Sequence, residues 1–204
     1  MSDDRPQPLA DAPICCQVVA LEQCLRSSPV VCRLLDALPG LQLPSWYIGA
    51  GAVAQTVWNQ LHGFPPGHGV KDYDVVYFDK DDLTPDGEQA VEVKVAEMLD
   101  FTVPVDVTNE ARVHTWYQRR FGQPLMPFHS TEQAIATWPS TATSVGVRTD
   151  GDSFDVCAPY GLRDLFGLIV RPNTTLVSRE VYEEKAERWR QLWPLLTVLA
   201  WPAL

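Results

Sequence analysis

The chain has 204 residues, of which 46% are hydrophobic and 21% charged, a composition typical of one globular domain of ordinary size. Its formal net charge of −10 argues against a large interface with nucleic acid, because such interfaces neutralise phosphates with many lysines and arginines. No segment reaches the roughly 20 apolar residues that a membrane-spanning helix needs. The composition therefore favours small substrates over long nucleic acids or membranes.

The N-terminal segment is acidic and contains proline, and it lacks the basic and apolar regions of a secretory signal. We expect residues 1–13 to form a disordered leader and residues 14–204 to form a single domain. The five cysteines are odd in number and include no C-x-x-C pair, which favours a reducing compartment over disulfide or zinc chemistry. These features predict a cytoplasmic location.

Helices and strands alternate through the first half of the domain. Apolar residues recur at helical spacing over 14–40, with an interruption near Ser27-Ser28-Pro29, which predicts two short helices. The following stretch predicts strands at 46–48, 72–79 and 103–109. It also predicts a helix that follows the Gly49-Ala50-Gly51 turn and ends at Gly63, and another helix over 85–100.

The second half is expected to add a hairpin and more helices. The patterns predict a helix over 111–121, another with Ser130 as its N-cap, and a last helix from Ser178 to about Leu196. Residues 142–148 and 153–158 flank the turn Asp150-Gly151-Asp152 and predict a β-hairpin. The order of elements indicates an α/β or α+β fold, with a short mixed β-sheet flanked by helices.

Acidic residues occupy the predicted strands in a pattern that suits metal binding. Side chains at i and i+2 of a strand point to the same face, so Asp72 and Asp74 project together. Two carboxylates about 4 Å apart repel by roughly 4 kcal/mol at an effective dielectric of 20, and a hard cation that bridges them removes this repulsion. Asp106 lies in an otherwise apolar strand, where a charge is costly unless paired or coordinated. If the two strands are neighbours, the three acids form a site for Mg²⁺ or Mn²⁺.

The glycine turn at 49–51 joins a predicted strand to a helix. There the backbone N–H groups of Gly49, Ala50 and Gly51 can approach phosphate oxygens. Rossmann and P-loop sites are excluded, because the later glycine of the dinucleotide motif and the G-K-[ST] sequence are both missing. Taken singly, an Asp-x-Asp pair is as often a solvated face, and a Gly-x-Gly turn is more often only a turn. The order of turn, paired acids and third acid favours a functional site.

This order resembles the nucleotidyltransferase superfamily of DNA polymerase β, and more narrowly the nucleotidyltransferase-like NTP_transf_6 group of bacteria. The residues that carry the resemblance are YIGAGAVAQTVWN at 47–59, KDYDVVYFD at 71–79, NEARVHTWY at 109–117, STEQAI at 130–135, APYGLRDLF at 158–166 and RPN at 171–173. The resemblance implies a polymerase-β-type fold with a catalytic core over 46–109 and family-specific elements over 110–204. It also implies metal ligation by Asp72, Asp74 and Asp106. The chain departs from the superfamily in its Gly-Ala-Gly turn and in the long loop that follows the next helix.

Three basic residues outside the core are candidate substrate contacts. Arg112 could hold a phosphate and His114 could assist proton transfer, with a packed helix capped by Asn109 as the alternative. Lys185 could touch the substrate, although core packing also explains the spacing of its helix face. Each lies in or beside a basic cluster that could form a phosphate site, and these clusters are Arg112, Arg119 and Arg120, and Lys185, Arg188 and Arg190.

The expected activity is the metal-dependent transfer of a nucleotidyl group from a nucleoside triphosphate (NTP) to an unidentified hydroxyl or phosphate acceptor, with release of pyrophosphate. One alternative is a non-catalytic nucleotide-binding or regulatory module with the same fold, and another is a metal-dependent phosphohydrolase. A pure binding module has no need of three mutually repelling acids. The His-Asp pairs that gather metals in many phosphohydrolases are missing from the sequence. Both observations favour the transferase.

Overall fold

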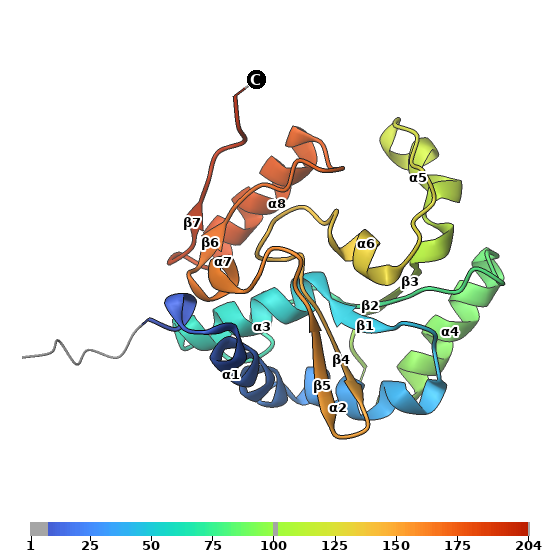
Figure 1. Ribbon diagram of the computed structural model, residues 1–204, viewed down its shortest axis with the longest axis horizontal. Coiled ribbons are helices and arrows are strands. Elements are labelled where there is room, and N and C mark those ends of the chain that lie inside the picture. The colour runs from blue at the N-terminus through green and yellow to red at the C-terminus, as the bar shows by residue number, and fades with distance from the viewer. Residues whose placement is uncertain (1–7, 100–101, 204) are drawn as a thin grey trace, which may run out of the picture.

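Five short strands form a mixed sheet in the order β3-β2-β1-β4-β5 (Figure 1). The computed structural model describes residues 8–99 and 102–203. Strands β2 and β3 are parallel, and the other neighbouring pairs are antiparallel. The strands are β1 (Tyr47–Gly49), β2 (Tyr73–Tyr77), β3 (Val105–Asn109), β4 (Gly146–Asp150) and β5 (Ser153–Cys157), and a small second sheet pairs β6 (Ile169–Val170) with β7 (Thr197–Val198). The predicted mixed sheet and its hairpin are confirmed.

Helices cover the sheet from both sides (Figure 1). One side carries α1 (Ile14–Arg26), α2 (Pro29–Ala37), α3 (Ala50–His62) and α4 (Pro85–Glu97), and the other carries α5 (His114–Phe121), α6 (Thr131–Ile135) and α8 (Arg179–Leu192). Short elements complete the fold: α7 (Arg163–Phe166) and the 3-10 helices η1 (Leu9–Asp11), η2 (Leu38–Leu41) and η3 (Glu110–Arg112). Across the described residues, no helix combines the length and apolar character that a membrane crossing needs.

The alternation of side chains along β2 separates the two faces of the sheet. Tyr73, Val75 and Tyr77 pack into the main core, to which the first four helices and α8 contribute buried side chains. Val76 points the other way and packs against Ile135 of α6. Asp74 shares the face of Val76, so it lies on the side of α5, α6 and α8.

Several boundaries differ from the predictions, and three of the differences have clear local reasons. Leu9–Asp11 form η1, and the Gln17 side chain donates hydrogen bonds to the carbonyls of Leu9 and Ala10, so the predicted leader is ordered from Pro8 onward. Residues 1–7 lie outside the described residues. Helix α8 ends at Leu192, four residues early, because Trp193 precedes a proline and leaves the helical conformation. Strand β4 begins only at Gly146, because the segment from Ser140 to Ser144 forms a hydrogen-bonded turn.

Candidate active site

Three acidic side chains line one cavity: Asp74 in β2, Asp106 in β3, and Asp72 directly before β2. The parallel pairing of the two strands places Asp74 directly opposite Asp106, and Asp72 precedes Asp74 by two residues on the same face. All three line a cavity of about 430 Å³ between the sheet and helix α8. The structure thus brings together the three acids that the sequence singled out.

The acids repel one another in this arrangement. Burial raises the pKa of Asp74 to about 7, and the charges of Asp72 and Asp106 add to the rise. A nearby Lys185 and a backbone hydrogen bond from Gly51 lower the same pKa. The pKa of Asp106 is also raised, first by burial and then by the charge of Asp72. Charge repulsion of this kind is relieved when a cation binds between the carboxylates.

The donor set suits a hard divalent cation, although it is not a closed cage. Among residues 8–99 and 102–203, no group of three or more histidine, cysteine or acidic side chains is gathered as a metal site. Magnesium is usually held by one or two carboxylates, with water and substrate phosphates completing its coordination. Oxygen donors that share one cavity and repel each other fit that mode of binding.

The glycine turn brings the backbone close to these acids. Ala50 has a left-handed conformation with φ of 49°, and it lines the cavity together with Gly51. A Cβ atom at Gly51 would lie 2.7 Å from Nε2 of Gln55 and 3.7 Å from Oδ2 of Asp74. A side chain at Gly51 would therefore intrude between the backbone and the acidic cluster.

Gly49 has a different role from its two neighbours. It pairs with Asp74 on one side and with Gly146 on the other, and it does not line the cavity. A Cβ atom at this position would lie 2.3 Å from the ring of Trp138. The absence of a side chain at Gly49 thus serves the packing of Trp138 on the sheet.

Four basic side chains surround the acids. They come from separate parts of the chain and all line the same cavity: Lys71, Arg120, Lys185 and Arg188. Helix α8 contributes Lys185 and Arg188 to the wall of this cavity, together with one acidic residue, Glu184. Each of the two basic clusters in the sequence therefore contributes to one site.

Helix α8 is held in place by tryptophan packing against α3. Trp58 makes edge contacts with Trp189 and Trp193, at centroid distances of 5.6 and 5.4 Å. The indole of Trp193 donates a hydrogen bond of 2.6 Å to Asn59, and Arg188 donates one of 2.5 Å to the carbonyl of Gly69. These contacts hold α8 in a fixed position relative to α3, with Lys185 and Arg188 at the cavity that the acids line.

Two polar groups in the cavity wall are left without a hydrogen-bond partner among the described residues. They are Oε1 of Gln55 and Nε1 of Trp189. The two residues are 5% and 4% exposed, so water does not readily supply the missing partners. Within the described part of the chain, the wall of the cavity thus holds two buried polar atoms without a hydrogen-bond partner.

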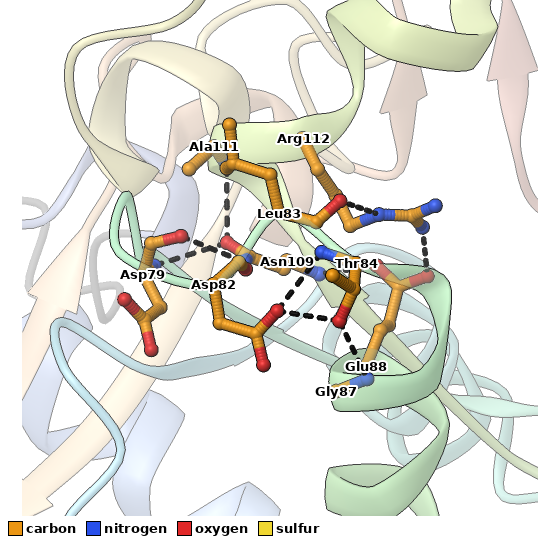
Figure 2. A network of polar contacts seen from close by, with 9 residues as sticks. All are labelled: Asp79, Asp82, Leu83, Thr84, Gly87, Glu88, Asn109, Ala111 and Arg112. Atoms are coloured by element: carbon orange, nitrogen blue, oxygen red, sulfur yellow. Dashed lines mark hydrogen bonds and ion pairs between the residues drawn. The ribbon is translucent and has the colours of Figure 1, made fainter.

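Arg112 belongs to a structural network and not to the cavity (Figure 2). Its guanidinium pairs with Glu88 and donates to the carbonyl of Leu83 at 3.3 Å. In the same network the Asn109 amide donates to the carbonyls of Asp79 and Asp82, each at 2.8 Å. The network joins the ends of β2 and β3 to the start of α4. The predicted phosphate contact of Arg112 finds no support in this geometry, because its side chain is buried against Glu88 and Leu83 and does not line the acidic cavity.

His114 also lies away from the cavity. It begins helix α5 and lines neither the acidic cavity nor the second cavity described next. Asn109 caps the short 3-10 helix η3, where its side chain accepts a hydrogen bond from the backbone of Ala111 at 3.1 Å. Helix α5, which carries Trp116, instead has Val113 at its N-cap.

Glu110 is a buried acid that the sequence did not single out. It is 5% exposed and lines a second cavity, of about 260 Å³, beside the acidic one. Burial raises its pKa to about 8, with further increases from the charges of Glu88 and Asp74, and a hydrogen bond from Trp138 opposes the rise. The sequence shows only a glutamate after a strand, and its burial depends on how α5 and α6 fold over it.

Comparisons with known proteins agree with this geometry. The family model described as Nucleotidyltransferase, NTP_transf_6, matches residues 36–198. A solved structure described as an NMR structure that reveals a CCA-adding enzyme head domain superposes with a TM-score of 0.72 and 25% sequence identity. That likeness covers 89% of this chain and 95% of the other. No functionally curated protein matches the sequence. The chain therefore belongs to the nucleotidyltransferase family, a family of transferases.

Proposed function

We propose that the chain transfers a nucleotidyl group from an NTP to a hydroxyl or phosphate acceptor and releases pyrophosphate. The main support is one observation: Asp72, Asp74 and Asp106 line a single cavity that four basic side chains surround. Carboxylates alone would repel a triphosphate. Basic residues alone could bind it, but they would not explain why three carboxylates lie in the same cavity. The combination suits a triphosphate that binds together with a divalent cation.

Each group in the cavity has a role in this proposal. Asp72, Asp74 and Asp106 would hold Mg²⁺ or Mn²⁺, which when bound neutralises triphosphate charge and acidifies the acceptor hydroxyl. The backbone at Ala50 and Gly51 lies beside the acids and would approach the phosphates closely. The four basic side chains would balance the remaining negative charge and orient the phosphates, as charge-assisted hydrogen bonds do.

The reaction is a displacement at the α-phosphorus of the NTP. A bond forms between the acceptor oxygen and the α-phosphorus, and the bond from that phosphorus to the bridging oxygen breaks. The electron pair leaves with pyrophosphate, and basic side chains on α8 would stabilise its charge. The acceptor proton passes to an ionised carboxylate of the cluster. Asp106 is our candidate, because it lines the cavity and is less buried than Asp74.

A labelling experiment tests this proposal. The full chain is incubated with Mg²⁺, a cell extract and each of the four NTPs labelled at the α-phosphate. Asp74→Asn removes a cavity acid, whereas Asp152→Asn removes an exposed acid at the tip of the β4–β5 hairpin as the matched control.

Transfer of label and release of pyrophosphate by wild type and Asp152→Asn, but not by Asp74→Asn, would support nucleotidyl transfer. Equal labelling with all three proteins would contradict it. Binding of NTP by wild type without transfer or pyrophosphate release would instead identify a non-catalytic nucleotide-binding module.

A further inference from the structure

An aromatic cavity adjoins the acidic cavity. Its volume is about 260 Å³, and much of its wall is made of flat rings from α5 and from the loops around α6: Trp116, Tyr117, Phe121, Phe128 and Trp138. The two cavities share Pro139, Val181 and Lys185. A single ligand with one charged end and one flat apolar end could therefore occupy both.

Charged side chains stand where the two cavities meet. Lys185 of α8 lines both. Arg120 of α5 lines the acidic cavity, and its guanidinium carbon lies 5.9 Å from the centroid of the Trp116 ring and 5.4 Å from that of Phe121. Cations at this junction can hold an anionic group while the rings beyond them contact an apolar one.

One buried polar group faces the aromatic cavity. Glu110 lines it, and the Trp138 side chain donates a hydrogen bond to the Glu110 carboxyl. Burial in this apolar wall favours the neutral form, which offers one donor and one acceptor. A flat ligand that carries hydrogen-bonding groups on its edge would satisfy them, whereas a purely aliphatic ligand would not.

We propose that the aromatic cavity receives the nucleobase of the NTP whose triphosphate occupies the acidic cavity. This inference rests on the proposed function. The base and the triphosphate are parts of one molecule, and the two cavities adjoin at residues that line both, including Lys185. Stacking of a base on an aromatic side chain contributes roughly 1–3 kcal/mol. The acceptor would then reach the α-phosphate from the open side of the acidic cavity.

Calorimetric titration of the full chain separates the two cavities. NTP probes both of them, and inorganic tripolyphosphate, which has no base, probes the acidic cavity alone. Both are titrated in Mg²⁺ into wild type, Trp116→Ala and Trp201→Ala. Trp201 packs beside Tyr182 and lines neither of the two cavities, so it is the matched control.

Trp116→Ala should weaken NTP binding about tenfold and leave tripolyphosphate binding unchanged. Trp201→Ala should change neither affinity. Equal affinity of wild type for NTP and tripolyphosphate, or an unchanged NTP affinity in Trp116→Ala, would overturn the inference. Failure of wild type to bind either compound would instead count against the proposed function.

A second measurement needs only the wild-type chain, in case Trp116→Ala does not fold. Trp116 and Trp138 both line the aromatic cavity, so an occupying base should change tryptophan fluorescence. NTP should quench the emission and tripolyphosphate should not. Identical spectra with the two compounds would overturn the assignment.

Discussion

Asp74 and Gly49 are direct partners across β2 and β1, and the same row of the sheet continues from Asp106 at one end to Gly146 beyond Gly49. The glycines stand where the sheet is covered: Cβ atoms at Gly49 and Gly146 would lie 2.3 Å from Trp138 and 2.7 Å from Ile135. The aspartates stand where the sheet opens into the cavity. Along this one row of four strands, the two glycines allow close packing and the two aspartates line the cavity.

The two glycines of the turn should respond differently to substitution. Gly49→Ala drives a methyl group into the Trp138 ring and should cost about 1–3 kcal/mol of unfolding free energy. Gly51→Ala meets mainly the movable Gln55 amide, so its stability should change less, while NTP affinity should fall. Urea unfolding and calorimetric titration of both variants measure the two effects. A greater loss of NTP affinity in Gly49→Ala than in Gly51→Ala would contradict these roles.

The network around Asn109 should support stability and not catalysis. Asn109→Ala removes side-chain hydrogen bonds to both Asp79 and Ala111 and leaves buried backbone groups unpaired. We expect a loss of about 3 kcal/mol in urea unfolding. Arg112→Met should also destabilise, because Glu88 loses its partner, yet tripolyphosphate affinity of the folded protein should stay unchanged. A selective loss of that affinity in Arg112→Met would restore the phosphate-binding role first predicted for this residue.

Lys185 should contribute directly to triphosphate binding. Lys185→Ala should weaken tripolyphosphate binding about tenfold, since hydrogen bonds to charged groups contribute roughly 1.5–3 kcal/mol. Arg190→Ala is the matched control on the same helix, because Arg190 pairs with Glu187 on the solvent side at 2.7 Å. Similar affinity losses in the two variants would indicate a general effect of net charge instead of a contact at Lys185.

The buried carboxyl of Glu110 should make stability depend on pH. Its folded pKa of about 8 lies above the ordinary value of 4.5, so the folded state binds more protons than the unfolded state between these values. Stability from this group is therefore full below about pH 4.5 and is lost as the pH rises toward 8. In EDTA, the Tm of wild type should decrease between about pH 5 and about pH 8, a range over which the Glu110 carboxyl loses its proton. The Tm of Glu110→Gln should decrease less over the same range. Parallel pH curves for the two proteins would refute a raised pKa.

Local patterns predicted most of the elements and the three acids. The i, i+2 relationship of Asp72 and Asp74 depends only on strand geometry, and the caps at Ser130 and Ser178 are formed as expected. The position of Asp106 beside them required one further assumption, that β2 and β3 are neighbours, which the structure confirms.

The basic residues of the site could not be chosen from the sequence. Arg112 and Arg120 belong to one sequence cluster, but η3 turns Arg112 toward Glu88 while α5 carries Arg120 to the cavity. The burial of Glu110 and the contact of α8 with α3 through Trp58 are likewise features of the tertiary structure. These features depend on packing between segments far apart in the chain, and no local pattern encodes them.

Thermal melting with and without Mg²⁺ tests the acidic cluster as a cation site most directly. In EDTA, Asp74→Asn should melt above wild type, because one of three repelling carboxylates is gone. Added Mg²⁺ should raise the Tm of wild type and of the control Asp152→Asn, and should leave Asp74→Asn nearly unchanged. An equal Mg²⁺-dependent rise in all three proteins would contradict a cation site at Asp72, Asp74 and Asp106.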